Sequence, residues 1–206
     1  MGFTRAELQA FRDQEVDDLV GPGLRLLFVG INPGLWTAAV GTHFAYPGNR
    51  FYPALAAAGI TEYEIDRVAG MSDSDRAYLV RRGIGITNVV RRATARADEL
   101  SREELRADGE RLLGFVAEHR PAVVAIAGIT AYRDAFGERK AAAGRQAQTP
   151  EGAERWSGAA LWVVPNPSGL NAHETVATLA AAYAAPAAEA GIVASPPVSA
   201  KVGSSQ

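Results

Sequence analysis

Four short, mostly apolar runs dominate the hydrophobic pattern of this chain, and polar, Gly-rich or Pro-rich segments separate them. They cover residues 24–30, 85–90, 122–128 and 160–164. A continuous apolar run of this length is typical of a parallel strand that is buried on both faces of a sheet. Segments with helical spacing lie between the runs, so the pattern predicts an α/β fold in which strands alternate with helices.

Helices are expected where apolar residues recur every three or four positions. The pattern predicts helices over residues 50–58, ending at Gly59, over 62–82 in two pieces broken near Gly70, and around 131–136. A weak helical pattern also covers residues 1–20. The stretch 137–158 is polar and irregular, which leaves room for edge strands.

Two capping patterns mark further helix starts. Ser101 and Glu104 form the capping box of a long helix that ends at Pro121. Asn171 and Glu174 form a weaker box ahead of the last helix. Four acidic residues fit helix starts and receive no catalytic role: Asp73, Asp75, Glu103 and Glu104.

These elements predict a three-layer sandwich, with a mainly parallel central sheet of about four strands and helices on both faces. A length of 206 residues with 48% hydrophobic content suits one domain with a proper core. We expect an N-terminal extension over residues 1–23, one domain over 24–190 and a disordered tail over 191–206.

Composition excludes several kinds of site. The chain has no cysteine, so disulfides, thiolate zinc sites, iron–sulfur clusters and a cysteine nucleophile are excluded. Three scattered histidines, His43, His119 and His173, argue against a metal site. Neither a Gly-x-Gly-x-x-Gly nor a Walker loop is present, so no cofactor is expected. No apolar run approaches a membrane span and the N-terminus lacks a signal-peptide pattern, so we expect a cytoplasmic protein with no membrane partner.

The charges limit the chemistry further. The formal net charge is −2, which argues against nucleic-acid binding, although a local basic patch suffices for a small footprint. The only lysines are Lys140, in a polar stretch, and Lys201, in the tail. Schiff-base chemistry needs an amine at the reacting carbon, so an amine nucleophile is disfavoured.

Two short loops follow two of the predicted strands. Residues 30–34 (Gly-Ile-Asn-Pro-Gly) come after the first run, and residues 166–171 (Asn-Pro-Ser-Gly-Leu-Asn) come after the last. Ligands bind at the carboxyl ends of strands in open α/β sheets, so these loops could meet across one crevice. A purely structural alternative remains for each: turn geometry at Asn32 and Gly34, and a helix-entry turn with Leu170 packed on the last helix.

Three blocks in this order, residues 30–34, 44–51 and 166–170, resemble the mismatch-specific uracil/thymine DNA glycosylases of the uracil-DNA glycosylase superfamily. The resemblance runs from about Leu24 to Tyr183. It implies a monofunctional, monomeric base-flipping enzyme without lyase activity, acting on double-stranded DNA that contains a mismatched or damaged pyrimidine. Such an enzyme extrudes uracil opposite guanine and hydrolyses the N-glycosidic bond, leaving an abasic site for base excision repair.

The resemblance also implies roles for single residues in the first loops. Asn32 matches the catalytic asparagine, which orients a water molecule. An amide has no useful pKa near neutrality, so we predict a slow enzyme compared with relatives that carry Asp at this place. The implied base-binding set is Gly30, Ile31, Pro33, Phe44 and Asn166, with the Phe44 ring stacked on the base. The alternative for Phe44 is a core aromatic.

In the last loop, Leu170 matches the wedge that fills the hole left by the flipped base. Gly169 would let the backbone approach DNA closely. Backbone near Gly169 and Asn171 would pair with the orphaned guanine, and Asn166 and Ser168 would contact phosphate or sugar.

Two positions depart from the family pattern, because Ala172 and Asn88 stand where relatives carry basic residues. The candidates to supply phosphate contacts instead are Arg50, Arg91, Arg92, Arg96 and His173, each with a solvated surface charge as the alternative.

Two other functions stay open at this point. One is a non-catalytic protein that binds mismatches or abasic sites, and the other is a hydrolase of free nucleosides on the same fold. The sequence does not fix the base spectrum either. Thymine needs room for its methyl group, and the candidate wall residues are Ile31, Thr37 and Ala38.

Overall fold

The computed structural model describes residues 2–192, which fold around one five-stranded sheet. The strands are β1 (Leu26–Gly30), β2 (Ile84–Asn88), β3 (Val123–Ala127), β4 (Gly144–Arg145) and β5 (Ala160–Val164). Their order is β2-β1-β3-β5-β4, and all neighbours are parallel except β4, which pairs antiparallel with β5. The predicted α/β class and mainly parallel sheet are confirmed, and the polar stretch 137–158 supplies the fifth strand at one edge.

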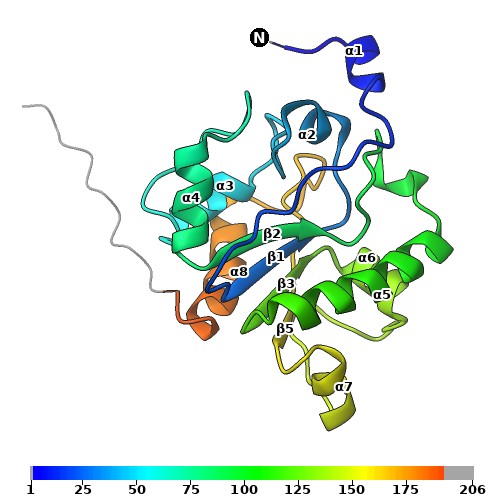
Figure 1. Cartoon of the computed structure of the whole chain (residues 1–206), viewed down its shortest axis with the longest axis vertical. Helices are drawn as coiled ribbons and strands as arrows, with labels where there is room; N and C mark the ends of the chain where they lie inside the picture. The colour runs from blue at the N-terminus through cyan, green and yellow to red at the C-terminus, as the bar shows by residue number, and fades with distance from the viewer. Residues whose placement is uncertain (1, 193–206) are drawn as a thin grey trace, which may run out of the picture.

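The register aligns the carboxyl ends of the parallel strands. Gly30 at the end of β1 lies opposite Asn88 at the end of β2, and Ala127 at the end of β3 lies opposite Val164 at the end of β5. The segments that follow these strands therefore emerge at one edge of the sheet (Figure 1). In Figure 1 the arrows of β1 and β2 point toward this edge.

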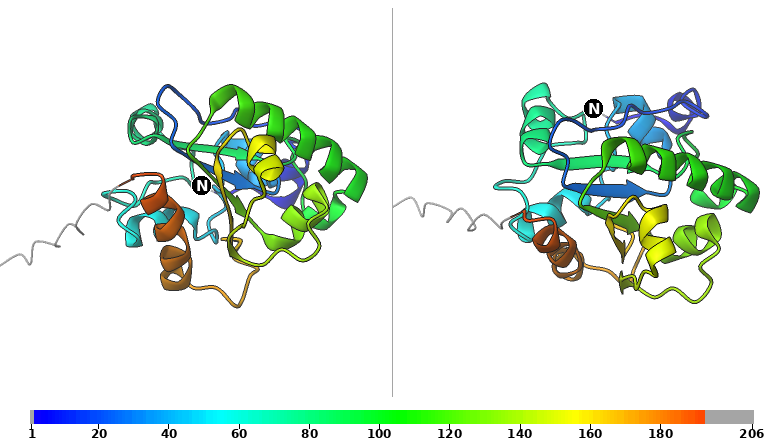
Figure 2. Two further views of the ribbon diagram at one scale, coloured as in Figure 1. Left: turned by 90° about the horizontal axis from the view of Figure 1, so that it is seen from below. Right: turned by 60° about the horizontal axis from the view of Figure 1, so that its bottom comes forward.

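Helices cover both faces of the sheet, as Figure 2 shows from two further directions. Alternate residues of β1 point to opposite faces. Phe28 belongs to a buried cluster with α3 (Phe51–Ala57), α4 (Asp73–Arg81) and α8 (Val176–Glu189). Val29 belongs to a second cluster with α5 (Arg102–His119) and α6 (Ile129–Phe136). The shorter helices are α1 (Arg5–Gln9), α2 (Leu35–Val40), α7 (Pro150–Arg155) and the 3-10 turn η1 (Ala97–Glu99).

The helix starts agree in part with those predicted from the sequence. Ser101 caps α5 by accepting from the Glu104 N–H at 3.1 Å, as predicted. The Glu104 carboxylate, however, binds the Arg92 side chain instead of completing the capping box. The predicted start of the last helix at Asn171 is wrong, because Thr175 caps α8 and forms the capping box with Thr178.

The predicted helix over 62–82 is also wrong in its first half, since only Asp73–Arg81 is helical. Long-range contacts hold residues 62–70 in an irregular path. The Glu62 N–H donates to the Tyr78 hydroxyl at 2.8 Å, and the Val68 carbonyl accepts from the Trp36 ring N–H at 3.0 Å. Local apolar spacing does not reveal such partners.

The N-terminal segment is helical only over Arg5–Gln9 and then runs along the edge of the sheet. Leu19 and Ile86 exchange two backbone hydrogen bonds of 2.9 and 2.8 Å, and the Leu19 side chain is buried. Residues 13–19 thus cover the free edge of β2 rather than forming a detached extension. The predicted disordered tail falls almost wholly outside the described residues. None of the helices within residues 2–192 has the length and apolar character to cross a membrane.

Candidate active site

The two loops singled out by the sequence meet at the carboxyl edge of the sheet. Gly128, the residue after β3, adopts φ +126°. A Cβ atom built there would lie 3.3 Å from Ile31 Cδ1 and 4.0 Å from Asn166 Cβ. Ile31 follows β1 and Asn166 follows β5, so the two loops flank the end of β3. Glycine at position 128 leaves the room that this arrangement needs.

The side-chain amide of Asn32 has a fixed orientation. Its Nδ2 donates to Thr94 Oγ1 at 2.7 Å and lies 3.1 and 3.2 Å from the carbonyl oxygens of Pro33 and Arg92. Thr94 Oγ1 donates its own hydrogen to the Arg96 carbonyl, so it can only accept from Asn32. Three acceptors therefore surround Nδ2, and the Asn32 Oδ1 receives no hydrogen bond from the described residues.

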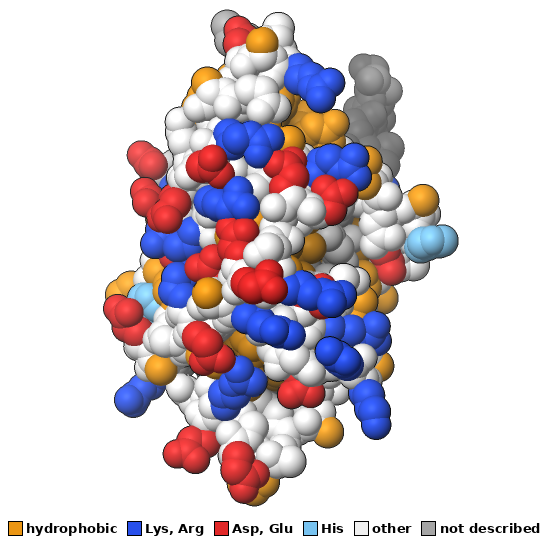
Figure 3. Space-filling view, turned by 90° about the vertical axis from the view of Figure 1, so that its right-hand side faces the viewer, with side chains coloured by type: hydrophobic (Ala, Val, Ile, Leu, Met, Phe, Trp, Pro, Cys, Tyr) orange, Lys and Arg blue, Asp and Glu red, His pale blue; other side chains and the backbone are white. Residues whose placement is uncertain are grey.

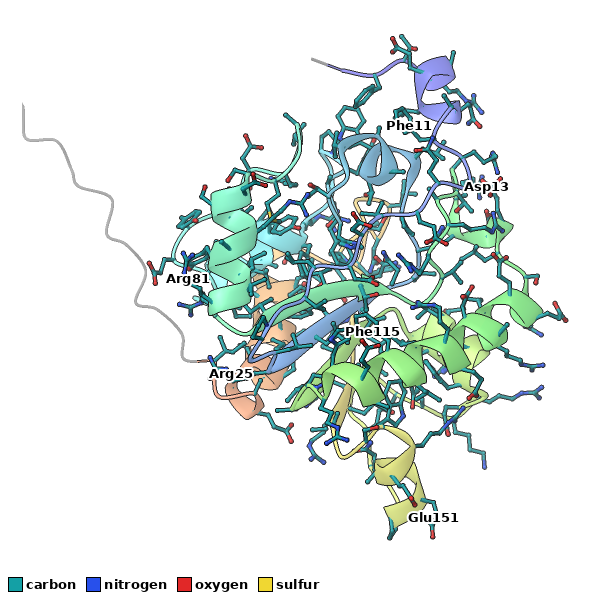
Figure 4. All side chains as sticks on the ribbon, viewed as in Figure 1. Phe11, Asp13, Arg25, Arg81, Phe115 and Glu151 are labelled. Atoms are coloured by element: carbon teal, nitrogen blue, oxygen red, sulfur yellow. The ribbon has the colours of Figure 1, made fainter. Side chains whose placement is uncertain are left out.

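The support beneath Asn32 is anchored in distant parts of the chain. The Arg92 guanidinium binds Glu104 on α5 through two nitrogens and Asp13 of the N-terminal segment at 2.9 Å. This pairing raises the pKa of Arg92 and lowers the pKa of Glu104. Figure 4 labels Asp13 on the segment that runs past the sheet. The charged cluster holds the Arg92 carbonyl in place below the Asn32 amide.

Phe44 lies next to the end of β1, partly exposed, with one ring face covered. It stacks on Phe51 with ring centroids 4.2 Å apart, and its backbone adopts φ +56°, which is unusual for a non-glycine residue. A Cβ at Gly30 would lie 3.1 Å from Phe44 Cζ. The Phe44 N–H has no hydrogen-bond partner within residues 2–192. Phe44 is therefore neither a fully buried core aromatic nor a free surface ring.

Asn88 and His43 form a buried polar pair that the sequence did not identify as functional. Asn88 Nδ2 lies 2.9 Å from His43 Nδ1, and His43 Nε2 lies 3.0 Å from the Asp17 carbonyl. A carbonyl can only accept, so Nε2 carries the proton and Nδ1 accepts from Asn88. Burial lowers the pKa of His43 to about 4, which keeps the ring neutral.

This tautomer of His43 determines the orientation of the Asn88 side-chain amide. With Nδ2 bound to His43, the Asn88 Oδ1 points to Gly30, where an added Cβ atom would overlap it. Asn88 thus presents an acceptor beside Phe44 at the end of β2. The position of Asn88 at the end of a predicted strand could have indicated a functional side chain. From the sequence we noted Asn88 only as the loss of a basic residue that relatives carry.

The polar residues of the loop 166–171 build the loop itself. Asn166 Oδ1 accepts from the Ser168 N–H at 3.0 Å, and Ser168 Oγ accepts from the Leu170 N–H at 3.3 Å. Asn171 Nδ2 donates to the Asn166 carbonyl at 3.2 Å. These side chains are used within the loop, so the loop is a preorganised turn.

Leu170 is 93% exposed at the tip of this turn. The alternative in which it packs on the last helix as a staple is wrong. Gly169 does allow a close backbone approach, but its partner is the protein's own chain. A Cβ at Gly169 would lie 2.6 Å from the Gly48 carbonyl oxygen, so glycine is needed here for packing within the protein, and its close approach to DNA stays a prediction.

The arginines expected to contact phosphate all have hydrogen-bond or ion-pair partners within the described residues. The Arg50 guanidinium donates to the carbonyls of Asn171, Glu174 and Gly169 at 3.0, 2.7 and 3.3 Å, and so clamps the leucine-bearing loop. Arg91 pairs with Glu15 at 3.3 Å, and Arg96 pairs with Asp98 at 2.6 Å. Arg50, Arg91 and Arg92 are half-buried with these partners, whereas Arg96 and His173 are exposed, and phosphate contacts by these residues stay a prediction.

The remaining predicted residues differ in their surroundings. Pro33 is buried, and its carbonyl also accepts from the Thr94 N–H at 3.1 Å. Gly34 has φ −78° and open space where a Cβ would lie, so turn geometry does not require glycine there. Thr37 is buried on α2, and Ala38 is half-buried. Residues 2–192 contain no group of three or more His, Asp or Glu side chains that could hold a metal ion.

A parallel sheet between helix layers, with its polar loops gathered at the carboxyl edge, is consistent with the uracil DNA glycosylase fold. A family model described as the uracil DNA glycosylase superfamily matches residues 18–186, and the chain therefore belongs to this superfamily. Its members are DNA glycosylases, which hydrolyse N-glycosidic bonds, so the chain falls in a class of enzymes that act on DNA.

A solved structure agrees at the level of the fold. It is the solution NMR structure of a "putative Uracil DNA glycosylase" from Methanosarcina acetivorans, which is similar with a TM-score of 0.51 at 16% sequence identity. The match covers 83% of this chain and 98% of that one.

Proposed function

We propose that this protein is a monofunctional glycosylase that flips uracil out of duplex DNA opposite guanine and hydrolyses its bond to the sugar. The observation that carries the proposal is the orientation of the Asn32 amide. Three oxygens hold Nδ2, which leaves Oδ1 as an acceptor for one hydrogen of a water molecule.

The chemistry follows from what an amide can do. Asn32 orients the water but does not take its proton, because an amide has no useful pKa near neutrality. The C1′–N1 bond breaks first, and its electron pair leaves with the base. The water oxygen then bonds to the oxocarbenium-like C1′ and releases a proton, and the base anion regains a proton from solvent. A mechanism without a general base predicts slow turnover.

The pocket groups suit a flipped pyrimidine. The Phe44 ring can stack on the base, since Phe51 supports its other face. The Phe44 N–H can donate to a carbonyl oxygen of the base, and Asn88 Oδ1 can accept from the N3–H of uracil. Hydrogen bonds of this kind hold the polar edge of an extruded base.

Leu170 serves as the wedge that fills the gap in the base stack. An exposed leucine on a clamped turn is preorganised for insertion between bases. The carbonyls of Gly169 and Asn171 each accept from Arg50 and retain a second lone pair. Guanine offers N1–H and N2–H donors once its partner has left, so these carbonyls favour guanine as the opposite base.

The main alternative is a non-catalytic protein that binds mismatches or abasic sites. It would use the same wedge without turnover. The Asn32 arrangement disfavours it, because binding alone does not require an oriented acceptor. A hydrolase of free nucleosides is disfavoured by Leu170, since a wedge has no use without a duplex.

The test is base release under single-turnover conditions, with enzyme in excess over duplexes that differ only in the target base and its partner. We expect free uracil from the duplex with guanine opposite, slower release with adenine opposite, and slower release again when thymine replaces uracil. Binding of the duplex without any free base would support the binding protein and contradict the glycosylase.

A further inference from the structure

A groove rich in arginine lies between α5 and α6, outside the candidate active site. It has a volume of about 380 Å³, and its charged lining consists of Arg102, Arg106, Arg133, Arg139 and Asp134. We call it the arginine groove. Four cations and one anion give this lining a formal charge of +3, in a chain whose net charge is −2.

The internal partners of these arginines neutralise little of that charge. Arg102 pairs with Asp134 at 3.3 Å. Arg133 donates only to the neutral Ala141 carbonyl. Within residues 2–192, the side chains of Arg106 and Arg139 form neither a hydrogen bond nor an ion pair, and both residues are exposed. Glu103 and Glu138 are sequence neighbours of lining residues but do not line the groove themselves.

The groove begins beside the candidate active site. α6 starts directly after Gly128, where an added Cβ would meet Ile31 and Asn166, and Thr130 in the first turn of α6 lines the groove. The first turn of α5 carries Glu104, which holds Arg92 beneath Asn32. Figure 3 faces this side of the molecule, and Lys and Arg side chains gather in its lower right part.

We propose that the arginine groove binds phosphate groups of the DNA backbone next to the flipped nucleotide. This inference rests on the proposed action on duplex DNA. A guanidinium presents a planar fork of donors that matches phosphate, and each neutralised phosphate releases counterions from DNA. The arginines that the sequence favoured for this role all have carboxylate or carbonyl partners within the described residues, whereas the side chains of Arg106 and Arg139 have none.

The experiment measures the dissociation constant of an uncleavable duplex, with guanine paired to cytosine throughout, as a function of salt. The double variant Arg106→Ala/Arg139→Ala is compared with the parent. Its matched control is Arg81→Ala, an exposed arginine at the end of α4 on the opposite side of the molecule (Figure 4). Arg106→Lys/Arg139→Lys keeps the charge, and thermal unfolding shows that each variant is folded.

We expect the alanine pair to weaken binding at low salt by about 10-fold or more, and to reduce the slope of log K against log salt by about 1–2. The lysine pair should keep most of the slope, and Arg81→Ala should match the parent. An unchanged slope in a folded alanine pair, or an equal loss in Arg81→Ala, would overturn the inference.

The outcomes also separate this inference from the proposed function. If the parent releases uracil but the alanine pair keeps the full salt slope, the groove assignment fails and the glycosylase stands. If the parent binds DNA through the groove but releases no base, the glycosylase fails and the groove stands. A parent that binds no DNA contradicts both.

Discussion

The loops after β1 and β5 use polar side chains in opposite ways. In the first loop, the polar side chain of Asn32 is the group that we propose to orient the water, and Arg92 and Thr94 hold it from a distant part of the sequence. In the second loop, the polar side chains of Asn166, Ser168 and Asn171 build the turn itself. The group that we propose to act on DNA is the apolar Leu170, which is 93% exposed.

The difference shows what each job requires. Orienting a water needs one atom at a defined position, so the fold surrounds the rest of the amide with acceptors. Filling a gap in a base stack needs an apolar group on a stable turn. The polar side chains of the second loop therefore form hydrogen bonds within the loop, and the Arg50 guanidinium binds its carbonyl oxygens. The two loops should therefore respond differently to substitution.

The largest effect is expected for Asn32→Asp. A carboxylate would direct an oxygen at the carbonyls of Pro33 and Arg92, which repel it. We predict a loss of uracil release of about 100-fold or more, because small misplacements of a reacting group cost this much. Single-turnover rates at several pH values check it. Release as fast as in the parent would mean that a carboxylate base works here and that the site is not built for an amide.

His43 gives the Asn88 amide at the end of β2 a pH-dependent support. Its pKa of about 4 in the folded chain lies below the ordinary 6.5, so the unfolded chain binds more protons between these values. Stability therefore falls as pH decreases from about 6.5 to 4, by about 3 kcal/mol from this group. Chemical denaturation of the parent and of His43→Gln measures the effect. The variant should lose this component of the pH dependence, and identical profiles would contradict the buried neutral histidine.

A pair of glycines compares the two loops directly. Gly169→Ala should destabilise the protein by about 1–3 kcal/mol, because its Cβ would lie 2.6 Å from the Gly48 carbonyl oxygen. Gly34→Ala should change stability by less than about 0.5 kcal/mol, since φ is −78° and the space is open. Thermal unfolding of both variants tests the contrast, and equal losses would show that the loops are not held as described.

The smallest effect on stability is expected for Leu170→Ala. The side chain is exposed, so unfolding should be unchanged within about 0.5 kcal/mol. Release of uracil from duplex DNA should fall by about 10-fold, because part of the roughly 1.5–3 kcal/mol of leucine burial is lost when DNA binds. Release from single-stranded DNA should stay the same. An equal loss of uracil release from duplex and single-stranded DNA would contradict the role of Leu170 as a wedge.

Much of the fold could be predicted because each buried strand carries its own local pattern. The run over 160–164 matches β5 in full, and the other three are correct to within two residues at each end. The sequence pattern does not define the short strand β4, since two residues at the edge of a sheet are too few to show a periodicity. The first half of 62–82 reads as helix but is irregular, because Tyr78 and Trp36 supply hydrogen bonds from far along the chain.

The sequence predicted which two loops meet at the carboxyl edge of the sheet, but not the contacts that support them. Motifs located Asn32, Phe44 and Leu170, whereas the partners of arginine side chains depend on the fold. Arg50 holds carbonyls more than 100 residues away, and nothing near it in the sequence indicates this. His43 gave no signal either, since its partners Asn88 and Asp17 come from separate segments.

The central claim is that Asn32 orients the attacking water, and single-turnover release of uracil by Asn32→Ala tests it most directly. The duplex carries uracil opposite guanine, and affinity for the duplex is measured in parallel. We predict that uracil release by Asn32→Ala falls by about 100-fold or more, while its affinity for the duplex and its thermal unfolding stay close to those of the parent. Release at the parental rate by a folded, DNA-binding Asn32→Ala variant would contradict it.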